Sequence, residues 1–237
     1  MDNNQIISAN YHDKCLTLYD KNFNLSKRID RINGELFAPI GLTVNHTEMS
    51  IYISDYDNNR ILNTDLEFNK LKSVGSSGSG DNQFNGPFDM CFQNHNLYIC
   101  DYYNKRIQIY SKDLEFLKTL KVDYLTWKIK ASNSILCVES GDSSGIHFYD
   151  LNSLSRQKNF NHGVCRISQI NSCFYEINHK SKQVYCYDHN GNLKEEIALT
   201  GLDNFIKDGW DATFIGLKGI LLMTSSSKMK VIKFSKN

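Results

Sequence analysis

The sequence predicts an all-β fold, a six-bladed β-propeller built from four-stranded antiparallel blades. Three observations predict it: a close internal repeat, four strand-like runs in each repeat, and weaker copies along the rest of the chain. Residues 53–61 read Ile-Ser-Asp-Tyr-Asp-Asn-Asn-Arg-Ile, and residues 99–107, 46 positions later, read Ile-Cys-Asp-Tyr-Tyr-Asn-Lys-Arg-Ile. A fixed period of this size is typical of an array of identical supersecondary units.

Each strong copy of the repeat contains four short runs of β-branched and aromatic residues, separated by Asn, Asp, Gly or Ser. In one copy the runs are residues 88–92, 97–100, 107–110 and 116–120, and in the other they are 41–44, 50–53, 61–63 and 68–71. Such runs, bounded by turn-forming residues, predict strands. Four antiparallel strands in 40–45 residues are typical of a propeller blade.

Weaker copies extend the repeat over the whole chain, which we therefore expect to form one domain of residues 1–237. Equivalent positions in the six copies are spaced by 45, 46, 39, 38 and 47 residues, at Leu16, Ile61, Ile107, Ile146, Val184 and Val231. The first copy has no room for a first strand, and the last copy stops after its third. Either the terminal blades are incomplete or the chain is a piece of a longer array; the sequence leaves both open.

The middle of the chain carries a family resemblance. A Gly-rich run at residues 75–80 leads into Gly-Asp-Asn-Gln-Phe-Asn-Gly-Pro, a strand, Leu-Tyr-Ile and Asp-x-x-Asn-x-Arg-Ile, and residues 37–42 repeat a Phe-x-Pro-x-Gly-Leu element. Over residues 37–120 this pattern resembles NHL repeats. The resemblance implies a six-bladed propeller that binds protein or RNA through one face, as in tripartite-motif ubiquitin ligases. The chain has no RING or B-box pattern of cysteines and histidines, so we expect no ligase activity of its own.

Composition narrows the functional classes. The chain has 237 residues, a net charge of +1 and 41% hydrophobic residues, which fits one globular domain and argues against bulk attraction to nucleic acid or membrane. The sequence shows no long apolar run and no secretory signal, and its seven cysteines form no C-x-x-C pair. We therefore expect a cytoplasmic protein with reduced thiols and no membrane partner, either monomeric or part of a larger assembly.

The Asp-to-Arg segments predict a structural signature rather than a ligand site. Asp and Asn stabilise turns by bonding nearby backbone, and the planar guanidinium of Arg can bridge a carboxylate to a second partner. We expect this arrangement to join neighbouring blades in both strong copies, through Asp55, Arg60, Asp101 and Arg106.

The turns between the second and third strands of each blade are the candidate binding site. In a propeller these turns open on one face, where they would gather tyrosines with lysines. Exposed tyrosines suit protein contacts, and they also suit single-stranded RNA, whose bases stack on aromatic rings. The alternative is that the tyrosines pack between blades and the lysines only face solvent. The candidate residues are Tyr11, Tyr56, Tyr102, Tyr103, Lys105, Lys180, Lys182 and Lys228.

No catalytic residue, metal site or cofactor is predicted. The chain lacks G-x-S-x-G and H-E-x-x-H, and the Gly-rich run at residues 75–80 lacks the following Gly-Lys-Ser/Thr of a phosphate loop. We interpret that run as a flexible connector between blades. The alternative function is a metal-dependent lyase or hydrolase with its site on the propeller axis, as in amidating lyases and lactonases, for which Asp89, Asn171 and Asp211 are candidate ligands.

Overall fold

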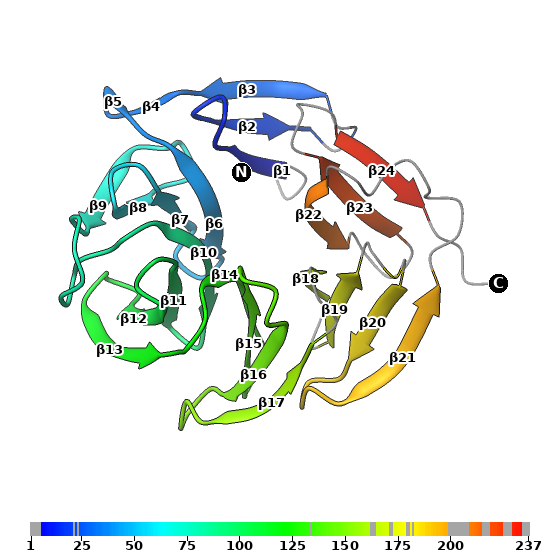
Figure 1. The fold of residues 1–237 in the computed structure, drawn as a ribbon. Helices are drawn as coiled ribbons and strands as arrows, with labels where there is room; N and C mark the ends of the chain where they lie inside the picture. Colours follow the sequence, from blue (N-terminus) through cyan, green and yellow to red (C-terminus); the bar gives the residue numbers. More distant parts are fainter. Residues whose placement is uncertain are drawn as a thin grey trace. The chain divides into compact units, whose positions relative to one another are not determined.

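The computed structural model describes residues 6–20, 22, 24–132, 134–161, 165–170, 173–178, 181, 183–198, 209–214, 219–224 and 229–233. Every regular element in these residues is a β-strand (Figure 1). Accordingly, these residues contain no helix of the length and apolarity needed to cross a membrane. The chain divides into two compact units, residues 1–127 and residues 128–237.

The first unit holds three antiparallel sheets and a two-stranded ribbon. The sheet nearest the N-terminus has three strands, β1 (Ile6–Asn10), β2 (Cys15–Tyr19) and β3 (Leu25–Ile29). The ribbon is β4 (Arg31–Ile32) with β5 (Glu35–Leu36). Two sheets have four strands each in sequential order: β6 (Pro39–Asn45), β7 (Ser50–Asp55), β8 (Arg60–Thr64) and β9 (Lys70–Val74); then β10 (Pro87–Gln93), β11 (Asn96–Asp101), β12 (Arg106–Ser111) and β13 (Phe116–Lys121).

The second unit repeats this order of strands. The strand β14 (Thr126–Ser132) begins at the end of the first unit and forms a four-stranded sheet with β15 (Ile135–Ser140), β16 (Ile146–Asp150) and β17 (Arg156–Phe160). The next sheet is β18 (Cys165–Ile170), β19 (Cys173–Asn178), β20 (Gln183–Tyr187) and β21 (Leu193–Ala198), and the last has three strands, β22 (Gly209–Phe214), β23 (Gly219–Thr224) and β24 (Met229–Lys233). The four strands predicted for each strong internal repeat are therefore present.

The middle strands of the two four-stranded sheets in the first unit are buried on both faces, which explains why they are rich in apolar residues. On β7, Ile51 and Ile53 pack in the cluster shared with β1–β3, whereas Tyr52 packs with Ile99 of the next sheet. Successive side chains of a strand point to opposite faces, so adjacent apolar residues serve two different cores. The outermost strand β9 faces solvent and is correspondingly rich in lysine.

The two Asp-x-x-Asn-x-Arg segments tie their sheets to the chain that precedes each of them. Arg106 donates from Nε to Asp101 at 2.7 Å and from its terminal nitrogens to the carbonyls of Ser79, Gly80 and Gln83 at 2.8 to 2.9 Å. Asp101 also accepts a bond from Asn104 at 2.9 Å. The motif therefore connects a buried carboxylate to the chain that enters its sheet.

The first strong copy uses the same geometry with one different partner. Arg60 donates to Asp55 at 2.8 Å and to Glu35 of β5 at 2.7 Å. Asn58 donates to Asp55 at 2.8 Å, and so does the backbone N–H of Ala38. In this copy a carboxylate side chain replaces the three carbonyl oxygens, and the arginine side chain is more exposed, 20% against 8%.

The Gly-rich run at residues 75–80 has a defined conformation, which corrects the expectation of a flexible connector. Phe84 donates from its backbone to Ser76 at 2.8 Å and accepts from Gly78 at 3.0 Å, so the connector folds back on itself. The Gln83 side chain accepts from the backbone of Gly80 at 2.9 Å. Gly78 has a φ of +148°, and a Cβ there would lie 2.3 Å from the Gln83 side chain. The glycines thus permit a tight loop that the arginine of the next blade holds.

The turns between third and fourth strands carry a second repeated pattern that the sequence reasoning missed. Asp65 accepts backbone N–H groups of Glu67 and Asn69 at 3.0 and 2.8 Å, and the Asn69 amide at 2.8 Å. Asp188 and Asn192 form the same bonds four residues apart. Such Asx turns satisfy their own polar groups locally. The signal in the sequence is Asp followed four residues later by Asn.

Candidate functional site

Three turns of the first unit have the same backbone structure, and each begins with a tyrosine. In each turn the fourth residue donates its N–H to the tyrosine carbonyl at 3.2 Å: Lys14 to Tyr11, Asn59 to Tyr56, and Lys105 to Tyr102. These fourth residues have φ angles of 50° to 52°, in the left-handed region. The three turns join β1 to β2, β7 to β8 and β11 to β12. The predicted second-to-third-strand turns therefore exist and present equivalent tyrosines.

The tyrosines from these turns are brought together. The rings of Tyr11 and Tyr56 meet edge to face with centroids 5.5 Å apart, and those of Tyr102 and Tyr103 do so at 4.8 Å. The hydroxyls of Tyr56 and Tyr103 lie 3.4 Å apart and connect the two pairs. Edge-to-face pairs stabilise each other beyond the area they bury. The four predicted tyrosines thus form one continuous group.

Two further aromatic residues, Phe88 of β10 and Trp127 of β14, complete the group. Their rings lie 4.4 Å apart, and Phe88 contacts Tyr56 and Tyr102 at 6.0 and 5.7 Å. Each follows the first residue of an innermost strand, a position shared with Ile40 of β6. That shared position is the signal that sequence reasoning missed. We call the six residues the aromatic surface: Tyr11, Tyr56, Phe88, Tyr102, Tyr103 and Trp127.

Solved structures resemble the whole chain. The WD40 repeats of RRP9 superpose with a TM-score of 0.72 at 11% identity, covering 98% of this chain and 78% of that one. The fold is an all-β propeller. A streptogramin B lyase gives a TM-score of 0.67 at 11% identity, covering 93% of this chain and 72% of that one, and a hydrazine synthase of Kuenenia stuttgartiensis gives 0.66 at 9%, covering 99% and 93%. No protein-family pattern and no curated sequence matches the chain.

The aromatic surface of the propeller is partly open to solvent. The side chain of Tyr103 is among the most exposed large hydrophobic groups, at 54%, and the other five members are half-buried. Gly86 lies beneath it with a φ of +71°, and a Cβ there would come within 2.9 Å of Tyr56 and 3.0 Å of Tyr103. The rings are therefore held by close packing while one side remains accessible, so they lose little freedom when they bind a ligand.

Charge at the aromatic surface is largely neutralised in the described residues. Lys14 donates to Asp57 at 2.8 Å, and the Tyr11 hydroxyl donates to the same carboxylate at 3.1 Å. This carboxylate raises the pKa of Lys14 through the hydrogen bond. Lys105 is exposed, and no ion pair to its ammonium is found among the described residues. The surface therefore presents aromatic rings and hydroxyls more than positive charge.

The phenols of Tyr11 and Tyr56 stay neutral at physiological pH. Burial raises the pKa of Tyr56, and its hydrogen bond with Tyr103 raises it further. Burial and the nearby carboxylate of Asp57 raise the pKa of Tyr11. A neutral phenol donates one hydrogen bond and accepts others, so these hydroxyls suit backbone carbonyls or amides of a ligand.

The structure does not describe every predicted site residue. Lys180, Lys182 and Lys228 fall outside the described residues, as does the proposed axial ligand Asn171. Asp89 is buried on β10, and no group of three or more potential metal-ligating side chains occurs among the described residues.

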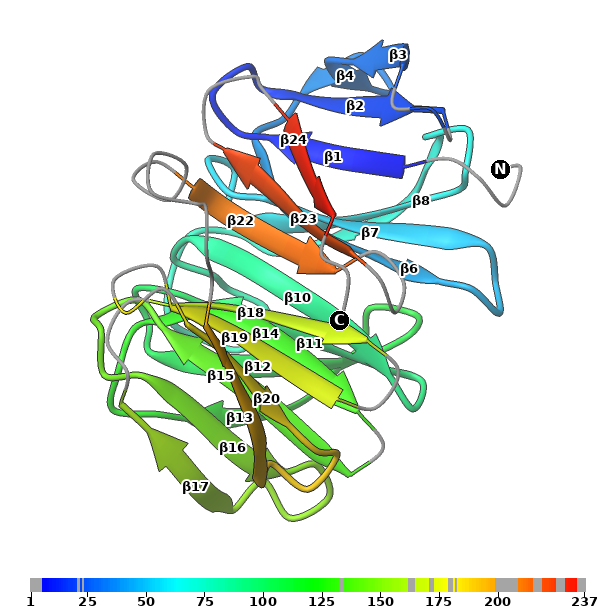
Figure 2. The same cartoon turned by 90° about the vertical axis from the view of Figure 1, so that its right-hand side faces the viewer.

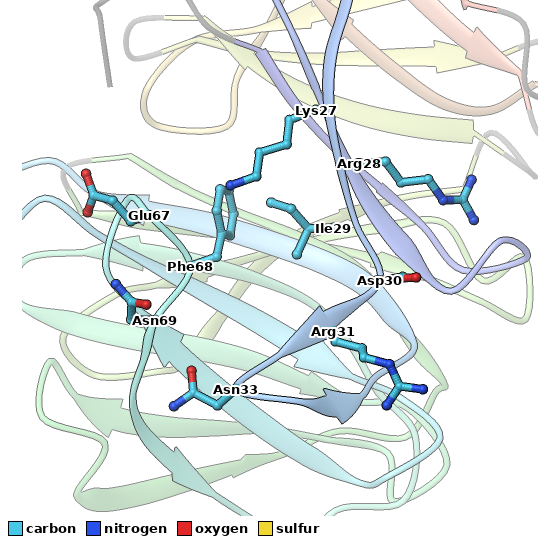
Figure 3. Close-up of a pocket in the computed structure, with 9 residues that line it drawn as sticks. All are labelled: Lys27, Arg28, Ile29, Asp30, Arg31, Asn33, Glu67, Phe68 and Asn69. Carbon is cyan, nitrogen blue, oxygen red and sulfur yellow. The ribbon is translucent and has the colours of Figure 1, made fainter.

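A shallow hollow of about 350 Å³ lies on the outer side of the first unit, near β3, β4 and the turn from β8 to β9 (Figure 3). Lys27 extends toward Phe68, whereas Arg28 and Arg31 extend to the other side of the strand. Arg28 donates to the Asp13 carbonyl at 3.0 Å, and Arg31 donates to the Gly34 carbonyl at 2.8 Å. Two of the three cationic side chains that line the hollow thus bond to the protein itself. The hollow is therefore not a candidate ligand site.

Proposed function

We propose that this propeller is a non-catalytic interaction platform that binds a protein partner through the aromatic surface. The observation that carries the proposal is the convergence of six aromatic side chains from four sheets, held by one another and open on one side. Tyrosine and tryptophan dominate the binding energy of protein interfaces because they bury much area with few rotatable bonds. The propeller fold commonly supports such contacts.

Single-stranded RNA is the competing ligand, and the charges favour protein. Binding to RNA depends on cations that replace the counterions of phosphates. In the described part of the surface, Lys14 is paired with Asp57 at 2.8 Å, and Lys105 is its exposed, unpaired cation. With one available cation among its described residues, the surface is better suited to peptide backbone and apolar side chains than to a phosphate track.

A metal-dependent lyase or hydrolase with an axial site remains the alternative function. The structural likeness to a streptogramin B lyase, at 11% identity, concerns the fold alone and does not favour this alternative. Metal analysis of the purified protein separates the two functions. Stoichiometric calcium or zinc would favour the metal-dependent enzyme over the interaction platform. We expect no such metal.

We further propose that the blades are NHL-type repeats, six in number, in a cytoplasmic protein. The Asp-Asn-Arg geometry repeated around Asp55 and Asp101 supports a common repeat, and six sheets of three or four strands in the described residues support the number. A count of complete blades from their geometry gives five rather than six. A crystal structure with six radial sheets would establish the number.

Site-specific photocrosslinking in the native cell tests the proposed function. A benzophenone amino acid at Tyr103 places a reactive group on the aromatic surface, and the same residue at Leu117, 49% exposed on β13, serves as the matched control. We expect a protein adduct from position 103 that is absent from position 117. Adducts to RNA would change the ligand class, and identical adducts or none from both positions would reject the aromatic surface as the binding site.

A further inference from the structure

Strand β1 is the structural counterpart of β7, the second strand of a complete sheet. The turn after β1 begins with Tyr11 as the turn after β7 begins with Tyr56, and Tyr11 reaches Asp57 of that turn at 3.1 Å. Across the turns, Asn10 pairs with Cys15 as Asp55 pairs with Arg60. The sheet β1–β2–β3 therefore corresponds to the second, third and fourth strands of the others (Figures 1 and 2).

Among the strands that the structure describes, none covers the inner edge of β1, whereas an innermost strand covers this edge in the complete sheets. The second strand pairs with an innermost strand in all four complete sheets, as β6–β7, β10–β11, β14–β15 and β18–β19. Within the described residues, β1 pairs with β2 alone. The strands with a covered inner edge are also more buried. All six residues of β7 and of β15 are buried, whereas all five residues of β1 are half-buried. An edge strand presents unpaired N–H and C=O groups that can pair with another chain.

Three of the four innermost strands, β6, β10 and β14, share a pattern that indicates which chemistry fits beside a second strand; β18 is shorter and has Ser168 at its fourth position. Each of the three has seven residues, and each is apolar at its fourth and sixth positions. In β6 these positions are Leu42 and Val44, which pair with Ile53 and Ile51 of β7 and pack against the core next to β1. Two of the three begin with proline, which fixes an extended entry.

We propose that the inner edge of β1 binds an extended segment of a partner protein, which adds an antiparallel strand to the sheet. The segment has about seven residues, apolar at the fourth and sixth, as in three of the four strands that fill this place in the complete sheets. Main-chain hydrogen bonds supply affinity, and the alternate side chains supply specificity. This proposal does not rest on the proposed function, and the edge adjoins the aromatic surface because β1 ends next to Tyr11.

Hydrogen exchange on the full chain tests the proposal with a synthetic peptide as the probe. The peptide carries the sequence of residues 38–46, and its control is the same peptide N-methylated at alternate residues, which removes ladder donors and keeps every side chain. We expect the amides of β1 that point away from β2 to exchange quickly in the free protein and about tenfold or more slowly with the peptide. The amides of β7 and β11 should show no change, and the control peptide should protect none of the amides of β1.

Four results would overturn the proposal. Amides of β1 as protected as those of β7 in the free protein, at every concentration, would show that the chain covers its own edge. Protection that rises with protein concentration would show that a second copy covers it. Binding of the peptide without protection of β1 would place the peptide elsewhere, and absence of binding would show that the edge accepts no strand.

Discussion

The turns at the two ends of the strands are stabilised in different ways. Turns between third and fourth strands are self-sufficient, because Asp65 and Asn69, or Asp188 and Asn192, satisfy polar groups within five residues. Two of the tyrosine turns add a long-range contact to their local bonds: Arg106 reaches back to Ser79, 27 residues away, and Arg60 to Glu35, 25 residues away. The comparison teaches that local polar bonds suffice at one end, whereas at the other end distant segments and packed aromatic rings also hold the turns.

Replacing Arg106 by methionine should have the largest effect on stability. Arg106 covers the fully buried carboxylate of Asp101, so its loss leaves an uncompensated buried charge that costs about 3 kcal/mol. The equivalent change at Arg60, more exposed at 20%, should cost less. Urea unfolding of both variants measures the difference. Equal losses would contradict the distinction drawn from burial.

Replacing Gly86 by alanine should disturb the aromatic surface directly. The added methyl would meet Tyr56 and Tyr103 at 2.9 and 3.0 Å, on a backbone with a φ of +71°. We expect a loss of about 1–2 kcal/mol because the residue must adopt a left-handed conformation and displace two rings. Thermal unfolding gives the stability and near-ultraviolet circular dichroism gives the ring environment. An unchanged aromatic spectrum would show that the rings are not held as described.

Acid should weaken the self-sufficient turns. Although partial burial raises the pKa of Asp188, hydrogen bonds from the backbone and side chain of Asn192 lower it to about 2. The unfolded chain has an aspartate pKa of about 3.9, so this stabilisation is present above about pH 4 and is lost as the pH falls toward 2. Denaturant unfolding between pH 5 and 2.5 should show a shallower acid dependence for Asp188→Asn than for the wild type. Identical pH profiles would contradict this role.

Replacing Tyr103 by serine should separate binding from folding. Tyr103 is 54% exposed and makes an edge contact with Tyr102, so we expect a stability loss of less than about 1 kcal/mol. To measure binding by this variant, the crosslinking amino acid is placed at Tyr56 instead. The yield of crosslinked partner, and its recovery in a pull-down, should nevertheless fall sharply. Full capture by the serine variant would remove Tyr103 from the site.

Replacing Lys105 by alanine should have the smallest effect. Its side chain is exposed, and surface substitutions of this kind change stability by less than about 0.5 kcal/mol. If the ligand is protein, the affinity should be nearly unchanged. If the ligand is single-stranded RNA, the affinity of the variant should instead depend less steeply on salt concentration. The slope should fall by about one counterion, because one phosphate contact is lost. Titration of a labelled oligonucleotide at two salt concentrations distinguishes these results.

The sequence predicted most of the fold because its signals are local. The echo of residues 53–61 in residues 99–107 fixed the turn structure, and the strand runs around it match β7, β8, β11 and β12. The missing first strand of the first copy was also visible, and β1–β2–β3 has three strands. The defined connector at residues 75–80 was not predicted, because its bonds to Arg106 join positions far apart in sequence.

The candidate site was predicted only in part for a similar reason. The turn tyrosines could be found because a propeller places equivalent turns on one face. Phe88 and Trp127 were missed because they lie on strands, where an aromatic residue ordinarily indicates core. The neutralisation of Lys14 was also missed, since Asp57 comes from the next sheet. Charge at a surface depends on such neighbours, which the spacing of residues in one repeat does not reveal.

The affinity of the captured partner for two matched double variants tests the central claim most directly. One variant carries Tyr56→Ser and Tyr103→Ser on the aromatic surface; the other carries Leu71→Ser and Leu117→Ser, which remove residues 59% and 49% exposed on β9 and β13. We predict that the first raises the dissociation constant about tenfold or more, as loss of central aromatic contacts does, while the second leaves it unchanged. A loss of affinity in the leucine variant with none in the tyrosine variant would contradict the account.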